Sequence, residues 1–122
     1  MKQDITCFED CHSLVARFYV HLLESDIAYI FTEVAKIDLE PHVRLVAQFW
    51  AQILLGTPGY DGNPMAPHIT LAKQTPLGDH EFARWLELFE RSVDELFQGE
   101  VANEAKNRAR HIAAVMKFKV NG

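Results

Sequence analysis

This chain of 122 residues has no long apolar run, no basic block and few cysteines. No stretch approaches the roughly eighteen apolar residues that a membrane-spanning helix needs, and the opening MKQDITCFED lacks the apolar core of a signal peptide. We therefore expect no membrane association and a cytoplasmic location. The formal net charge of -5 disfavours a nucleic-acid partner, because phosphate binding depends on clustered Lys and Arg.

Cysteine is limited to Cys7 and Cys11. A spacing of four places both on one face of a predicted helix, where the Cβ geometry is awkward for a disulfide. An iron–sulfur cluster would need more cysteines. We expect two reduced structural thiols, in keeping with a reducing compartment.

The motifs of several enzyme classes are also missing. Gly56, Gly59 and Gly62 do not form a G-x-G-x-x-G pattern, and they follow a predicted helix instead of a strand. The segment HEFAR begins like a zinc-protease motif but lacks the second histidine one turn later. No Ser-His-Asp or Cys-His arrangement is indicated by spacing.

Aromatic residues and helical periodicity are what the sequence has in abundance: eight Phe, three Tyr and two Trp. Strand-like alternation is nowhere sustained, so we predict an all-α fold in a single domain over residues 1–122. Gly56 and Gly99 are expected to end helices, and Asp79 to cap one. The apolar spacing predicts helices over 10–24, about 41–56, about 64–71, 80–98 and 101–118, with a short helix or turn over 26–34.

Each of the four long predicted helices has apolar residues at helical spacing. In the helix from about residue 41, His42 heads a predicted stripe of Leu45, Val46, Phe49 and Ile53. The last helix carries a face made of Ala102, Ala105, Ala109, Ile112, Ala113 and Met116.

Polar groups on apolar faces are the candidate site. His42 and His68 lie in apolar company, whereas we expect His12, His21, His80 and His111 at the surface. Tyr19 and Trp85 add a phenol and an indole N–H on two other helices. Each could be a core residue whose polar end finds a local partner. Together they predict a shared apolar pocket with a few aimed polar atoms, as in a small-ligand or cofactor site.

Several segments then resemble one family, the group III truncated haemoglobins. They are RFYVHLL, HVRLVAQFWAQILLG, YDGNPMAPHITL, FARWLELFERSVDELFQGE and AKNRARHIAAVMK. The resemblance runs in order from about residue 12 to 118, and the glycine-pair motifs of the other two truncated groups are missing. It implies a two-over-two helical sandwich around haem b.

The resemblance also implies roles for single residues. His68 corresponds to the proximal iron ligand, Tyr19 and Trp85 to the distal polar residues, and His42 to a distal-helix histidine near the pocket entrance. The matching aromatic positions in or beside the pocket are Phe18, Phe31, Phe49 and Trp50. Arg44 and Lys73 are candidates for the haem propionates.

The turn-rich segment GTPGYDGNP before His68 fits this role. A haem is wide and flat, so the helix carrying its ligand must stand off from the preceding helix and turn back across the ring. We expect the glycines to take positive φ and Pro64 to start the short helix. His68 would then arrive one turn into that helix, on its apolar side.

A single axial histidine would leave the sixth iron position for O2, CO or NO, or for peroxide, water or anions on ferric iron. We expect both the Tyr19 hydroxyl and the Trp85 indole N–H to donate hydrogen bonds to bound O2. Trp85 can only donate, and the alternative is that Tyr19 donates to a neighbour instead. The function implied is O2 binding by a haem globin. The alternatives are an enzyme for NO dioxygenation or peroxidase-like chemistry, served by an unidentified reductase, and a haem-free helical interaction domain.

Overall fold

The computed structural model describes residues 2–60, 62 and 65–121. Over these residues the chain is helical, and the extended backbone pairs only in an isolated bridge between Gln3 and Phe97. The all-α prediction is confirmed. No helix in this described part of the chain is both long and apolar enough to cross a bilayer.

The observed helices begin and end close to where the apolar spacing predicts them. Residues 26–34 form turns followed by a short π-helix, η1, as the predicted short helix or turn. The predicted start at Pro64 lies outside the described residues. The elements are α1 (Phe8–Leu23), η1 (Ile30–Val34), α2 (Leu39–Leu55), α3 (Met65–Ala72), α4 (Asp79–Leu96) and α5 (Glu100–Asn121).

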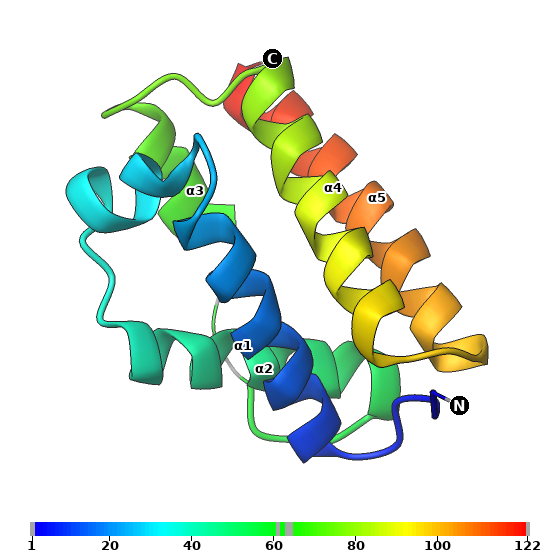
Figure 1. Cartoon of the computed structure of the whole chain (residues 1–122). Helices are drawn as coiled ribbons and strands as arrows, with labels where there is room; N and C mark the ends of the chain where they lie inside the picture. The colour runs from blue at the N-terminus through cyan, green and yellow to red at the C-terminus, as the bar shows by residue number, and fades with distance from the viewer. Residues whose placement is uncertain (1, 61, 63–64, 122) are drawn as a thin grey trace.

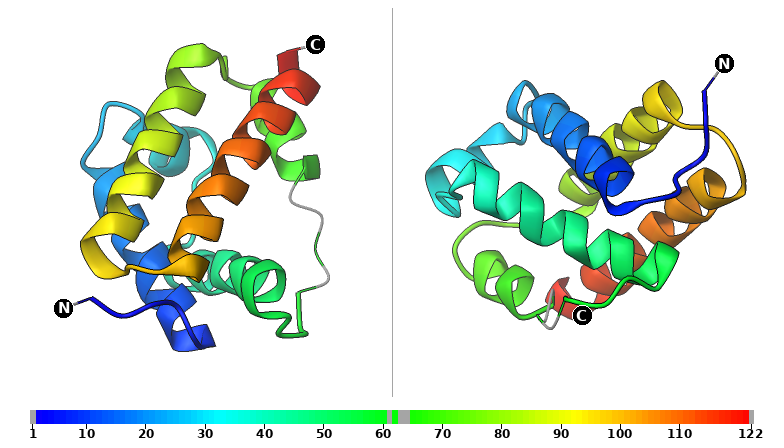
Figure 2. Two further views of the ribbon diagram at one scale, coloured as in Figure 1. Left: turned by 90° about the vertical axis from the view of Figure 1, so that its right-hand side faces the viewer. Right: turned by 90° about the horizontal axis from the view of Figure 1, so that it is seen from below.

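The helices form two crossed pairs (Figure 1). α1 packs on α2, and α4 runs antiparallel to α5, with α1 and α4 in contact between the pairs (Figure 2). α3 lies against α5. The two-over-two arrangement of helix pairs is confirmed.

The core lies where α1 and α4 meet. Phe18 and Phe89 are its largest fully buried side chains. α5 contributes small residues at helical spacing, so that its backbone can approach closely. Its buried positions are Ala102, Ala105, Ala109, Ala113 and Met116, as predicted, and Ile112 is half-buried at the edge.

The apolar stripe predicted for α2 is partly wrong. Leu45 is 48% exposed, and the face turned to the core carries Val43, Ala47, Trp50 and Ala51. Positions 46, 49 and 53, on the side of His42, are only half-buried. α2 therefore has two adjacent apolar sides, and periodicity alone could not tell which of them meets α1.

The ends of the helices agree with only part of the prediction. Gly56 ends α2 in the left-handed conformation at φ 70°, as expected. The N-cap of α4 is Gly78, not Asp79, because the Glu81 carboxylate reaches back to accept the Gly78 N–H at 2.7 Å. α4 ends at Leu96, and Gly99 follows in the connection at φ 141°.

A carboxylate from the start of the chain caps α5. The Asp4 oxygens accept the N–H groups of Val101 at 3.0 Å and Ala102 at 2.8 Å. A Cβ at position 99 would lie 2.5 Å from the Asp4 Cγ, so glycine is required there. Burial raises the pKa of Asp4, but the backbone donors of Val101, Ala102 and Ile5 outweigh it and hold that pKa below its ordinary value.

Both cysteines are free thiols, as expected, but only Cys11 lies within the helix. Cys7 is the exposed N-cap of α1 with extended backbone, φ -151°. Cys11 is buried inside α1, and burial, followed by the charges of Asp10 and Cys7, raises its pKa to about 11.

Candidate functional site

A hydrogen bond between α1 and α2 forms the centre of the site. The Tyr19 hydroxyl lies 2.7 Å from Nε2 of His42, and their rings meet edge to face at 5.3 Å. Tyr19 is 5% exposed and also packs edge to face on Phe31 of η1 at 5.7 Å. The only polar group that the described side chains offer this phenol is therefore the imidazole.

Both partners of this bond are neutral at pH 7. Burial raises the pKa of Tyr19, since the phenolate would be poorly solvated. Burial, and then the charge of His68, lowers the pKa of His42. A phenol is a stronger acid than a neutral imidazole N–H, and an imidazole nitrogen is the better acceptor. The favoured arrangement has Tyr19 donating to Nε2 while Nδ1 carries the imidazole proton.

His68 is half-buried on α3, within electrostatic reach of His42. The structure thus brings two imidazoles from different helices into one region. An imidazole nitrogen is a common axial ligand of haem iron, so either histidine has the side chain that such a site needs.

Trp85 approaches the same region from α4. It is half-buried, meets Phe18 edge to face at 5.5 Å and lies parallel to Phe89 at 5.8 Å. Phe18 in turn meets Tyr19 at 5.6 Å. One buried ring therefore separates the phenol from the indole, and three of the predicted site residues are brought together.

The second apolar side of α2 suits a flat cofactor. Val46, Phe49 and Ile53 follow His42 at helical spacing and remain half-buried. A macrocycle on this side of α2 would bury these side chains close to the imidazole of His42. The residues present therefore fit a haem.

Trp50 lies in the core and not on this second apolar side of α2. It is 2% exposed and stacks on Phe89 at 4.6 Å. Phe49 is half-buried and contacts both Trp50 at 5.6 Å and Tyr60 at 5.4 Å.

The remaining histidines agree only in part with the prediction. His111 and His80 are exposed, and His80 pairs with Asp26 at 2.6 Å. His21 was expected at the surface, but it is half-buried between α1 and α4, where it hydrogen-bonds Glu95 at 2.6 Å. His12 is also half-buried.

The two residues suggested for propionate binding lie apart from each other in the chain. The Arg44 guanidinium lies over the Phe8 ring at 5.4 Å, and Lys73 is exposed just after α3. Their roles stay predictions.

Two glycines of the loop before α3 agree with expectation. Gly56 and Gly59 have φ of 70° and 126°. At Gly62 a Cβ would fall 2.8 Å from the Tyr60 hydroxyl, so the tyrosine favours glycine there.

Sequence reasoning missed the Tyr19–His42 bond, although it singled out both residues. The signal was available in principle, because each is a polar group on an apolar face of a long helix. Their separation of 23 residues places them on different helices, so only the packing of α1 on α2 reveals that they meet.

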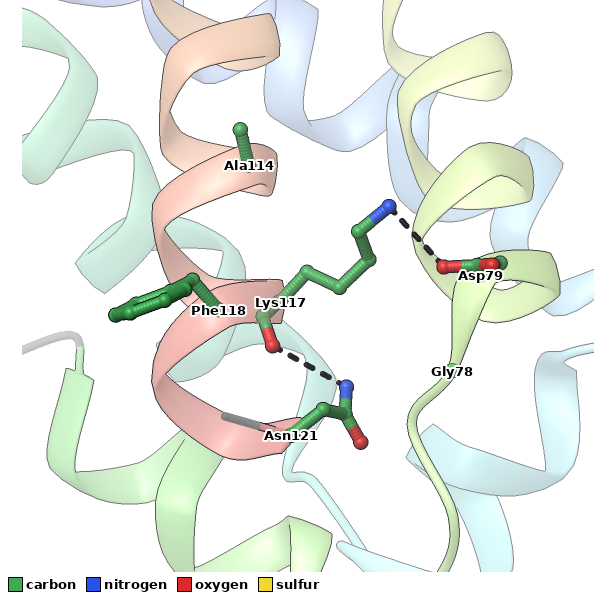
Figure 3. A pocket seen from close by; sticks show the side chains of 6 residues that line it. All are labelled: Gly78, Asp79, Ala114, Lys117, Phe118 and Asn121. Carbon is green, nitrogen blue, oxygen red and sulfur yellow. Dashed lines mark hydrogen bonds and ion pairs between the residues drawn. The ribbon is translucent and has the colours of Figure 1, made fainter.

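A surface pocket lies away from these residues, between the start of α4 and the end of α5 (Figure 3). It has a volume of about 490 Å³, and Lys117 and Asp79 pair across it at 3.1 Å. None of its lining residues belongs to the site, and its exposed Phe118 and charged rim do not resemble an enclosed ligand pocket.

Comparisons with known proteins agree with this geometry. A family model described as bacterial-like globin matches residues 4–121. The group 3 truncated hemoglobin ctb of Campylobacter jejuni subsp. jejuni is 34% identical over 77 residues, which cover 63% of this chain and only 58% of that relative. The crystal structure of a group III truncated hemoglobin from Campylobacter jejuni matches with a TM-score of 0.85 and 29% identity, covering 98% of this chain and 95% of that one. The resemblance read from the sequence is confirmed.

Proposed function

The chain belongs to the bacterial-like globin family, whose members bind haem, and we propose that it binds O2 at haem b held by His68. The observation that carries this proposal is the packing of Phe18 between Tyr19 and Trp85, with Tyr19 hydrogen-bonded to His42. His68 of α3 lies within electrostatic reach of His42. One imidazole then serves as axial ligand and the other groups form the distal side.

A haem iron with one histidine ligand supplies an open position for a small molecule and draws electron density onto it. The chain's own contribution is to place hydrogen-bond donors and exclude water. Trp85 can only donate, so its indole N–H is the donor assigned to the ligand. Phe18 keeps that indole in place by edge-to-face contact.

Tyr19 has a different role from Trp85 in this proposal. Its proton is held at Nε2 of His42, so its oxygen presents lone pairs instead of a hydrogen to the pocket. His42 therefore does two things: it stands in the first turn of α2, as a gate would, and it decides what Tyr19 offers to the ligand.

The proposed axial ligand can be tested by substitution. His68→Ala should lose haem or bind it weakly, and added imidazole should partly restore the spectrum. His80→Ala is the matched control, since that histidine is exposed and pairs with Asp26. A normal five-coordinate ferrous spectrum in His68→Ala, together with its loss in His80→Ala, would show that the wrong histidine was chosen.

Peroxidase-like chemistry is the second candidate. It is favoured by one observation, the continuous ring contacts that lead from Trp85 through Phe89 to Trp50. Rapid mixing of the ferric protein with peroxide, and of the oxygenated protein with NO, separates peroxide chemistry and NO dioxygenation from simple O2 binding.

A further inference from the structure

A row of five aromatic rings connects the distal side of the site with the loop before α3. The ring centroid of Trp85 lies 5.8 Å from that of Phe89, which lies 4.6 Å from that of Trp50. Trp50 is 5.6 Å from Phe49, which is 5.4 Å from Tyr60. Each ring therefore touches the next, although the residues come from α4, α2 and the following loop.

The oxidisable members of this row are spaced along it. Indole and phenol side chains lose an electron far more readily than the benzene ring of Phe. Phe89 separates the two indoles and Phe49 separates Trp50 from Tyr60, so each transfer between oxidisable side chains crosses a single intervening ring. Both Trp residues of the chain belong to the row.

The two ends of the row differ in their surroundings. Trp85 is half-buried beside Phe18 and the site, Trp50 is 2% exposed in the core, and Tyr60 is half-buried in a loop. A one-electron vacancy formed near Trp85 would therefore pass through the core to Tyr60, whose half-buried side chain lies in a loop away from the site.

We propose that Trp85, Trp50 and Tyr60 form an electron-transfer path that refills the haem site with electrons after it has reacted with a peroxide. The inference rests on the proposed function, because it needs a haem beside Trp85. It adds an outlet for oxidising equivalents, which would otherwise damage the site residues.

The chemistry balances with peroxide as the oxidant. Hydrogen peroxide takes up two electrons and two protons and gives two molecules of water, the O–O bond being broken. With haem bound, one of these electrons would come from the haem, which stays one electron oxidised until an external one-electron reductant restores it. The path would supply the other. Trp85 gives that electron and is refilled from Trp50, which is refilled from Tyr60. Tyr60 also releases its phenolic proton to solvent and becomes a neutral phenoxyl radical, while solvent supplies the second proton.

Tyr19 is the competing end point for this vacancy. It contacts Phe18, and its proton could pass to His42 over 2.7 Å. A radical there would stay buried in the site, however, whereas one at Tyr60 reaches the surface. The chain holds three tyrosines, and the third, Tyr29, is 37% exposed and in none of the ring contacts among the described residues.

The test uses the haem-loaded ferric protein mixed with hydrogen peroxide. Radicals are captured with a nitroso spin trap and located by peptide mass spectrometry, with freeze-quench EPR distinguishing phenoxyl from indolyl radicals. We expect the wild-type adduct on Tyr60. Trp50→Phe should lower it by about tenfold or more, equivalent to a barrier raised by about 1.4 kcal/mol. Tyr60→Phe should replace the phenoxyl signal with an indolyl one, and the matched control Tyr29→Phe should change neither.

Either of two results overturns the path: an unchanged Tyr60 adduct in Trp50→Phe, or a main adduct on Tyr19 or Tyr29 in the wild type. Tyr60→Phe alters only a loop side chain, so it decides the question even if Trp50→Phe folds poorly. Persistence of the phenoxyl signal in Tyr60→Phe also contradicts the proposal. A failure of the proposed O2 function is seen separately. Either the haem-loaded protein does not bind O2, or its O2 dissociation rate is unchanged when Trp85 is substituted.

Discussion

Substituting His42 tests most directly which hydrogen bonds the Tyr19 hydroxyl makes in the proposed distal pocket. His42→Leu keeps a side chain of similar bulk but removes the acceptor that lies 2.7 Å from the Tyr19 hydroxyl. Tyr19 is only 5% exposed, and its ring also contacts Phe18 and Phe31. A buried donor without an acceptor costs about 1–3 kcal/mol. The partly charged O2 would then be its new acceptor.

The size of the effect follows from that exchange. A net hydrogen bond contributes about 0.5–1.5 kcal/mol, and a factor of ten in rate is about 1.4 kcal/mol. His42→Leu should therefore slow O2 dissociation by roughly threefold to tenfold. Tyr19→Phe alone should leave the O2 off-rate nearly unchanged, because the tyrosine proton is held by His42. In the His42→Leu background, Tyr19→Phe should reverse the gain.

Stopped-flow O2 displacement on the wild type, the two single variants and the double variant measures this coupling. CO accepts hydrogen bonds poorly, so its dissociation should barely respond and serves as the control. Faster O2 release in His42→Leu, or release sped tenfold by Tyr19→Phe alone, would refute the reasoning. It would mean that Nε2 of His42 carries the proton and that Tyr19 donates to the ligand in the wild type.

Two further predictions concern Trp85 and Asp4. Trp85→Phe keeps the ring contacts with Phe18 but loses the N–H, so stopped-flow O2 dissociation should speed by about ten- to a hundredfold, from a bond of roughly 1.5–3 kcal/mol; unchanged release would exclude the indole as donor. Asp4→Ala should lower the urea-measured free energy of unfolding by about 1 kcal/mol at pH 7, because α5 loses its cap. Since the folded pKa of Asp4 is depressed, this difference should be full above the ordinary value of 3.8 and vanish as pH falls through the lower, folded value; a difference independent of pH would contradict the role of the carboxylate.

The sequence was most informative where structure depends on neighbours along the chain. Gly56 takes the left-handed conformation that a helix end needs, and the alanine face of α5 is buried as its spacing predicts. These features arise within one or two helical turns. They can be predicted without knowing how distant segments of the chain pack.

The errors arise where a distant element decides. Leu45 belongs to an apolar run, but α1 packs against the neighbouring side of α2 and leaves Leu45 exposed. The sequence predicts His21 at the surface, but α4 packs beside it and places Glu95 within hydrogen-bonding distance. Asp79 has a side chain suited to an N-cap, but the N-cap is Gly78, whose N–H is accepted by the Glu81 carboxylate from the first turn of the helix.

The candidate site divides in the same way. His42, His68, Tyr19 and Trp85 could be selected from the sequence because each is a polar group in apolar company. Their pairing could not, since the Tyr19–His42 bond depends on the crossing of two helices. The likeness to a group III truncated hemoglobin supports the arrangement, and the roles of these residues stay proposals.

The Asp4 cap affects how the amide hydrogens in the first turn of α5 exchange with solvent. Helix ends normally fray on their own, so their amides exchange with solvent without any wider opening. The Val101 and Ala102 N–H groups are instead held by a residue 97 and 98 positions earlier. Their exchange with solvent therefore reports whether the N-terminal segment remains docked on the start of α5.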